Sequence, residues 1–270
     1  MCPKFCTDAK PYKHTQTLAL RKNNVIADIY GLCEWYKDRN DFKGGGNMTQ
    51  KTCEKCDGAV AYFHLPGLFE FYGLYSLFLP LFYNHREYFC DWCEIGSIYG
   101  APADCLWGGG RVGFGDDEAE KVLRLTQKYG ISARLTFSNS LIKQEHLSDR
   151  KCNRLCEMFS ESKAVPNGVI ICSDLLLEYI GKNYPGLYFV SSTTKVLTDF
   201  CEFENELNRE EFRYVVPDFR LNKSFDNLKA LSQHQKEKVE FLCNECCWFG
   251  CMDRKKCYET VSRKNLGEDC

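Results

Sequence analysis

The chain has 270 residues, a formal net charge of −2 and a pI near 6.2, values that show no overall bias toward nucleic acid or an anionic membrane. They leave room for a local basic patch. The length suits one large α/β domain or two smaller ones. The 18 cysteines exceed ordinary usage but stay below the density of a small secreted disulfide scaffold.

The opening residues, MCPKFCTDAKPYKHTQ, contain no apolar core and no small-residue cleavage site. We therefore predict no signal peptide and a cytoplasmic location. Thiols stay reduced in that compartment, so clustered cysteines indicate metal or redox chemistry rather than disulfides.

Residues 1–58 are polar and lysine-rich, and we predict that they form an N-terminal elaboration of the main domain. Two short β-type runs flank Asn23-Asn24, which is typical of a hairpin. Two cysteine pairs have a spacing that suits tetrahedral zinc: Cys2 with Cys6, and Cys53 with Cys56.

Residues 67–83 form the stretch that most resembles a membrane span. Glu70 and Pro80 interrupt it, and it is slightly short for a bilayer. We therefore predict a buried helix that follows a strand, and no membrane span.

Residues 59–270 alternate apolar β-type runs with amphipathic helical patterns, which favours a parallel sheet covered by helices. The number of short strands favours an α/β fold of the (β/α)8, TIM-like type. The barrel would be complete if the N-terminal hairpin supplies an eighth strand and incomplete otherwise. The seven predicted strands lie at 59–66, 94–100, 131–139, 167–174, 186–193, 212–218 and 239–245.

Polar side chains follow these strands, at the barrel end where active sites lie. Each could instead cap the next helix, but together they favour a ligand pocket. Arg111 follows a glycine run, which would let the backbone approach a ligand whose carboxylate or phosphate the guanidinium binds. The other predicted pocket residues are Asn139, Asp174, Ser192, Asp218 and Glu245.

The segment CNECCWFGCMDRKKC, residues 243–257, holds the densest group of thiols. Strand alternation turns Cys243 away from its neighbours. Cys247, Cys251 and Cys257 fall in a loop that runs into a helix, where they can gather around a metal, and Cys270 follows that helix. A ligand set made only of sulfur suits a 4Fe–4S cluster or structural zinc equally well. The remaining cysteines include Cys105, Cys152, Cys156 and Cys172, which we interpret as core residues.

The segment NGVIICSDLLLEYIGKNYPGLYFVSSTTKVL, residues 167–197, resembles the collagenase-like peptidase family of barrel proteins. FRYVVPDFRLN looks like that family's next strand, and the cysteine-rich segment occupies the place of its cysteine-bearing segment. The resemblance covers roughly residues 130–265. Some relatives in this family take part in the hydroxylation of RNA bases or quinone precursors, and some of them hold a four-cysteine iron–sulfur cluster. The resemblance therefore implies a similar activity for this chain. The implied ligands are Cys247, Cys251, Cys257 and Cys270, with Cys33 as an alternative fourth.

Our leading hypothesis is a metal- or iron–sulfur-dependent barrel enzyme that modifies an RNA base or a small aromatic substrate. The alternative is a collagenase-like peptidase, or a non-catalytic barrel with structural zinc. A brown, iron-containing protein would favour the first hypothesis, and stoichiometric zinc would favour the second.

Overall fold

The computed structural model describes residues 60–109, 119–162, 165–245 and 247–268. The described residues divide into two compact units. The larger unit contains Tyr62–Tyr72 and the chain from Glu94 onward, and the smaller unit contains Gly73–Cys93. The predicted N-terminal elaboration with its hairpin and cysteine pairs, together with Arg111, lies outside the described residues.

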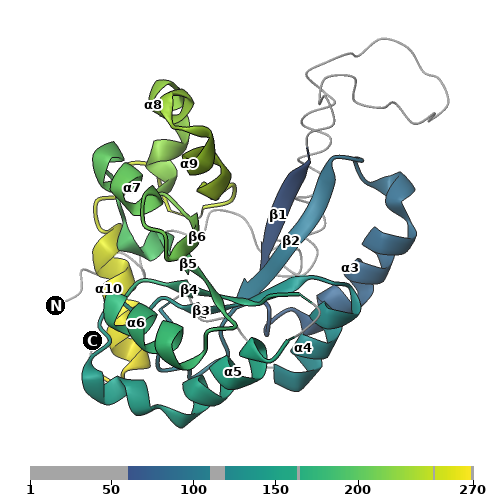
Figure 1. Cartoon of the computed structure of the whole chain (residues 1–270), viewed down its shortest axis with the longest axis horizontal. Helices are drawn as coiled ribbons and strands as arrows, with labels where there is room; N and C mark the ends of the chain where they lie inside the picture. Colours follow the sequence, from purple (N-terminus) through teal and green to yellow (C-terminus); the bar gives the residue numbers. More distant parts are fainter. Residues whose placement is uncertain (1–59, 110–118, 163–164, 246, 269–270) are drawn as a thin grey trace, which may run out of the picture. The chain divides into compact units, whose positions relative to one another are not determined.

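The larger unit is built on a six-stranded parallel sheet in which each strand neighbours the next one along the chain. The sheet curls into a half-barrel, which is consistent with an incomplete β/α barrel (Figure 1). Its strands are β1 (Ala61–Pro66), β2 (Cys93–Gly100), β3 (Ser132–Phe137), β4 (Gly168–Ile171), β5 (Tyr188–Ser191) and β6 (Phe212–Val215).

The central strands form where the apolar runs predicted them. All four residues of β4 are buried, and in β3 the side chains of Ala133, Leu135 and Phe137 are fully enclosed. A parallel strand covered on both faces needs such a continuous apolar run, because neither face meets water.

Helices connect the strands, and α4, α5 and α6 lie along one face of β3 and β4 (Figure 1). Three helices begin at residue types that favour helix N-termini: Asp149, Ser173 and Asp199 each accept a hydrogen bond from a backbone N–H of the first turn. The helices of the larger unit are α4 (Ala119–Lys128), α5 (Arg150–Ser160), α6 (Asp174–Asn183), α7 (Phe200–Leu207), α8 (Phe225–Ala230), α9 (Gln233–Lys238) and α10 (Arg254–Asn265).

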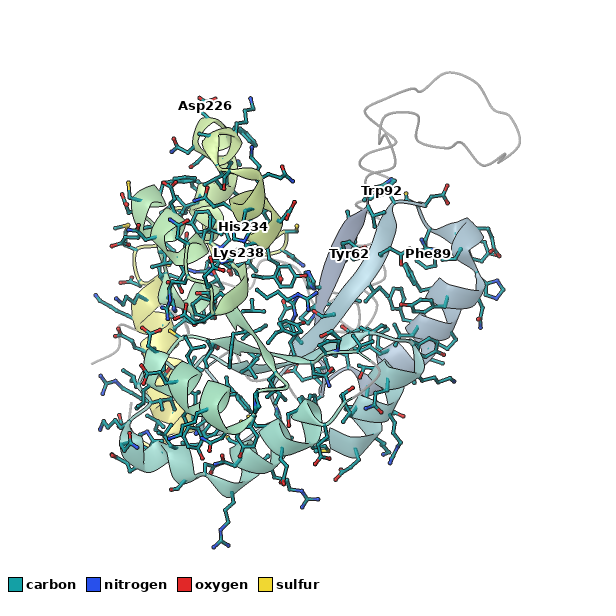
Figure 2. The ribbon with its side chains drawn as sticks, in the orientation of Figure 1. Tyr62, Phe89, Trp92, Asp226, His234 and Lys238 are labelled. Carbon is teal, nitrogen blue, oxygen red and sulfur yellow. The ribbon has the colours of Figure 1, made fainter. Side chains whose placement is uncertain are left out.

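A buried lysine fastens α9 to the connection between α7 and β6. The Lys238 ammonium donates to the carbonyls of Leu207 and Arg209, at 2.7 Å each. Lys238 and His234 both project from α9 (Figure 2). Lys238 therefore satisfies the carbonyl of the last residue of α7, which the helix leaves unpaired, and binds a second carbonyl in the connection that follows.

The smaller unit contains most of α3 (Tyr72–Asn84) and the short 3-10 helix η1 (Arg86–Tyr88). Phe78, Phe82 and Phe89 pack against one another, and the Arg86 guanidinium lies 4.4 Å from the Phe82 ring centroid. The predicted helix in this segment is confirmed. In the described part of the chain no helix is long and apolar enough to cross a membrane.

The prediction of a seventh strand over residues 239–245 is wrong in extent. One parallel bridge joins Val215 to Val239, and the Glu240 N–H donates to the Val215 carbonyl at 3.1 Å. Beyond that point Cys243 and Asn244 are exposed, so the segment lacks the two buried faces of a central strand. The described residues therefore form a half-barrel, and they contain no closed eight-stranded barrel.

Candidate functional site

Two of the predicted pocket residues belong to an ion-pair cluster after β6. Asp218 is fully buried, and its carboxylate lies 2.6 Å from the Arg220 Nε and 3.2 Å from the Arg254 Nε. The carboxylate of Glu245 also pairs with the Arg254 guanidinium, and its other oxygen accepts from the Cys247 N–H at 2.9 Å. These charges hold α10 and the cysteine-rich segment against the end of the sheet.

Asn139 and Ser192 are buried at strand ends and bond to the protein itself. The Asn139 amide donates to the carbonyls of Leu106 and Ser262, and its oxygen accepts from the Leu141 N–H. The Ser192 hydroxyl accepts from the N–H of Thr194 at 3.2 Å. Asn139 thus joins the end of β3 to α10 and to the loop after β2.

Gly108 and Gly109 pack against protein backbone. A Cβ on Gly109 would lie 2.3 Å from the Ser138 carbonyl oxygen, and the Asn139 N–H donates to the Trp107 carbonyl at 3.0 Å. Asp174 is exposed at the start of α6 and pairs with Arg209 at 2.9 Å. The ligand-binding role predicted for these strand-end residues stays a prediction.

A hollow of about 260 Å³ lies where β3, β4 and β5 end, and we call it the strand-end hollow. The loops after the three strands line it from one side and α10 from the other. Its residues are Ser140, Leu141, Cys172, Thr194, Lys195, Lys255 and Glu259. Sequence reasoning missed Cys172 and Lys195 as site residues, although Cys172 directly follows β4 and Lys195 closely follows β5.

The electrostatics of the strand-end hollow keep its thiol protonated. Burial raises the pKa of Cys172, and the Thr194 hydroxyl and the Lys195 ammonium act in the opposite direction without overcoming it. The Lys195 ammonium donates to a Glu206 oxygen at 2.5 Å. The hollow therefore offers two ammonium groups, one carboxylate, hydroxyls and a neutral thiol within a small volume.

A second hollow, of about 220 Å³, lies between α6, β5 and the connection to β6. Its charged residues are Asp174, Glu178, Arg209 and Glu211, and Arg209 already pairs with Asp174 and Glu206. Among the described strands, only β5 contributes a residue to the lining of this second hollow. The strand-end hollow is the better candidate, because three successive strand ends converge there.

A polar network crosses the inside of the half-barrel. His64 on β1 lies with its Nδ1 2.8 Å from the Ser97 Oγ and its Nε2 3.4 Å from a Glu240 oxygen. The Arg134 guanidinium donates to that oxygen at 2.6 Å and to the Tyr188 hydroxyl at 2.8 Å. Because β1 is one edge strand of the sheet and Glu240 lies beside β6 at the other edge, this contact requires the curl of the sheet.

Burial perturbs the groups of this network strongly. Desolvation, assisted by the charge of Arg134, lowers the pKa of His64 to about 3, so the ring is neutral at pH 7. Burial raises the pKa of Glu240 although Arg134 opposes it, and burial raises the pKa of Tyr99 to about 12. Perturbed groups of this kind mark either a functional site or a structural network.

The contacts of this network run from Ser97 to His64 and from His64 to Glu240, in the order of the nucleophile, base and acid of a hydrolase. Two observations oppose that role. The Ser97 side chain is fully buried, and a histidine with a pKa near 3 is a poor proton acceptor at neutral pH. The network is therefore better explained as the polar core that joins β1, β2, β3 and β5 to the segment after β6.

The cysteines divide into buried and accessible groups. Cys105 and Cys152 are buried, as predicted for core residues, and their sulfur atoms lie 3.2 Å apart. In the C-terminal segment, Cys247 and Cys251 are partly exposed and Cys257 is exposed. Among residues 60–109, 119–162, 165–245 and 247–268, no three His, Cys, Asp or Glu side chains are arranged to hold a metal ion. Cys33 and Cys270 lie outside those ranges.

The fold and the hollow define a parallel α/β half-barrel with a candidate ligand site at its strand ends. No protein-family profile matches the sequence, and no curated protein matches it. Among solved structures, the chain resembles the U32 peptidase Mk0906 with a TM-score of 0.54 and 14% sequence identity. The match covers 83% of this chain and 85% of that chain. At this identity the likeness shows the fold alone, and it agrees with the collagenase-like resemblance noted in the sequence.

Proposed function

We propose that the chain is a peptidase-like half-barrel protein that binds a peptide, or a similar ligand with a free carboxylate, in the strand-end hollow. The observation that carries the proposal is the convergence of Lys195, Lys255, Thr194 and Cys172 at the carboxyl ends of three parallel strands. Carboxyl ends of strands are where barrels of this kind place their ligand sites. The likeness to a U32 peptidase supports a peptide as the ligand.

The composition of the hollow favours an anionic ligand end. Lys195 is held by Glu206 and approaches the Phe212 ring to 4.8 Å, which fixes the position of its ammonium. Lys255 extends from the first turn of α10 on the opposite side. A carboxylate between them would gain charge-assisted hydrogen bonds, and Ser140 and Thr194 would supply hydroxyls. The volume suits one or two amino-acid residues rather than a long peptide.

Binding would be tested with short peptides in two forms, one with a free C-terminus and one amidated. Calorimetry should show tighter binding of the free form. Lys255→Gln should weaken that preference by about tenfold, because it removes one charge-assisted contact. Lys256→Gln is the matched control, because Lys256 is 81% exposed, pairs with Asp253 and is not among the residues that line the hollow. Equal binding of both peptide forms would contradict the proposal.

Hydrolysis needs a separate test. The Cys172 thiol is protonated at neutral pH, and a protonated thiol is a poor nucleophile. Mass spectrometry of the same mixtures would show whether the peptides are cut. Binding without cutting would assign the chain to a non-catalytic binding module. Cutting that Cys172→Ala abolishes, with binding retained, would assign the thiol a direct part in the reaction.

Iron–sulfur-dependent modification of an RNA base or aromatic substrate remains a prediction. In the part of the chain that the structure describes, Cys247, Cys251 and Cys257 do not form a ligand set with one another. Iron and zinc content after anaerobic purification would test it. Stoichiometric metal that the serine variants of Cys247 and Cys251 both lose would support the predicted centre.

A further inference from the structure

The turn Trp248–Met252 exposes three large apolar side chains. Trp248 is 77% exposed, Phe249 53% and Met252 85%. The Cys251 N–H donates to the Trp248 carbonyl at 3.0 Å, so the three side chains belong to one tight turn. Single exposed apolar residues are ordinary, but three on one turn mark a surface that contacts something else.

The base of this turn is anchored. The Arg220 guanidinium donates to the Cys251 carbonyl at 3.2 Å, and the Phe249 ring meets the Phe219 ring edge-on with centroids 5.9 Å apart. On the N-terminal side, Glu245 accepts from the Cys247 N–H at 2.9 Å. Because both ends are bound to the buried ion-pair cluster, the apolar side chains are presented by a fixed support.

Lysines surround the turn. The Lys223 ammonium lies 5.6 Å from the Phe249 ring centroid, and Lys255 and Lys256 are exposed in the first turn of α10. Among the residues that the structure describes, two carboxylates lie beside the turn, and both are paired: Asp253 with Lys256 at 3.6 Å, and Glu245 with Arg254. The three lysines outnumber these two carboxylates, although the whole chain carries a net charge of −2.

We propose that the turn Trp248–Met252 docks on an anionic lipid surface. Trp248, Phe249 and Met252 would enter the boundary between headgroups and acyl chains, and Lys223 and Lys256 would meet the lipid phosphates. Segments that lie in this boundary are typically rich in tryptophan and phenylalanine, with lysines beside them. Each nearby lysine adds attraction to an acidic leaflet.

Lipid fits these observations better than RNA. Arg220 and Arg254, the nearest planar cations, are already paired with Asp218. Stacking on bases needs planar side chains, and Met252, the most exposed of the three, has no planar face. An apolar medium accommodates all three side chains.

The test is sedimentation of the full chain with phosphatidylcholine vesicles, with and without phosphatidylserine. We expect binding to the phosphatidylserine vesicles that weakens as salt rises. The triple variant Trp248→Ser, Phe249→Ser and Met252→Ser should lower the partition coefficient by at least about tenfold, because it removes the apolar area that would be buried. Leu77→Ser is the matched control, since Leu77 is 74% exposed on α3 and should leave binding unchanged.

Charge is tested separately with Lys223→Glu and Lys256→Glu, which leave the strand-end hollow intact. This double variant should lose most of the preference for phosphatidylserine. Absence of vesicle binding at low salt, or equal binding of the triple serine variant, would overturn the proposal. Binding of a single-stranded RNA in place of vesicles, lost in the lysine variants, would assign the surface to RNA and overturn it as well.

Discussion

Two cysteine pairs of identical spacing lie in different surroundings. Cys152 and Cys156 are four residues apart on α5, where both are fully buried, and the sulfur of Cys152 touches that of Cys105. Cys247 and Cys251 are also four residues apart, but they lie in a loop and are partly exposed. On a helix this spacing puts both side chains on one face, whereas in a loop it fixes no common direction. Spacing alone therefore does not assign a chemical role to a thiol.

The two regions also differ in what stabilises them. The α5 thiols lie among apolar side chains such as Leu155 and Phe159, and burial raises the pKa of both Cys152 and Cys156. The C-terminal segment is attached by the ion pairs of Arg254 with Asp218 and Glu245. We infer that the first region responds to changes of volume and the second to changes of charge.

The largest expected difference between the two regions is in the rate at which their thiols are alkylated. In the native protein iodoacetamide should label Cys243 and Cys257 at least about a hundredfold faster than Cys152 and Cys156, because a buried thiol reacts only after local opening. Peptide mass spectrometry over time measures the rates, and labelling in denaturant should make them similar. Similar rates in the native protein would abolish the contrast between the two regions.

Arg254→Ala tests the attachment of the C-terminal segment. It leaves the buried Asp218 carboxylate with one cation fewer, and we expect the free energy of unfolding to fall by about 3 kcal/mol. Urea denaturation measures the change, and Cys247 and Cys251 should also alkylate faster. Arg263→Ala is the control: Arg263 is half exposed, pairs with Glu268 and should change stability by less than about 0.5 kcal/mol. Equal effects of both substitutions would show that the cluster does not support the segment.

A pH titration extends the contrast to the polar interior. The pKa of His64 is lowered to about 3 in the folded state, so between pH 6.5 and pH 3 the unfolded chain binds more protons at this site than the folded chain. This contribution to stability is present above pH 6.5 and is lost as the pH falls. Between pH 7 and pH 4.5 the loss should be about 2–3 kcal/mol, and His64→Gln should remove that part of the slope. An unchanged slope in the variant would show that His64 is not buried in neutral form.

Serine substitution should have the smallest effect and should still separate the regions. Cys152→Ser places a hydroxyl in an apolar site and should cost about 1–3 kcal/mol. Cys257→Ser, on an exposed face of α10, should change the free energy of unfolding by less than about 0.5 kcal/mol. Chemical denaturation of both variants measures the difference. Equal costs would mean that Cys152 tolerates a polar atom despite its burial.

Six of the seven predicted strands are confirmed. In β3 and β4 the reason is that both faces are covered and need a continuous apolar run, whereas β1 and β6 are partly exposed. Residues 239–245 failed as a strand because only Val239 and Glu240 find a partner backbone in β6. The sequence predicted a ligand site at the strand ends, which stays a prediction, and none of the predicted pocket residues that the structure describes lines the strand-end hollow. Cys172 directly follows β4 and Lys195 lies four residues after β5, yet nothing local distinguishes a side chain that lines a hollow from one that packs inward.

The sequence by itself determined the alternation of strands and helices, the caps at Asp149, Ser173 and Asp199, and the absence of a span in α3. These features depend on neighbours within a few residues. The tertiary structure alone decided that His64 meets Glu240 and that Cys105 meets Cys152, since those partners lie far apart along the chain. The curl of the sheet brings the first pair together, and the packing of α5 brings the second.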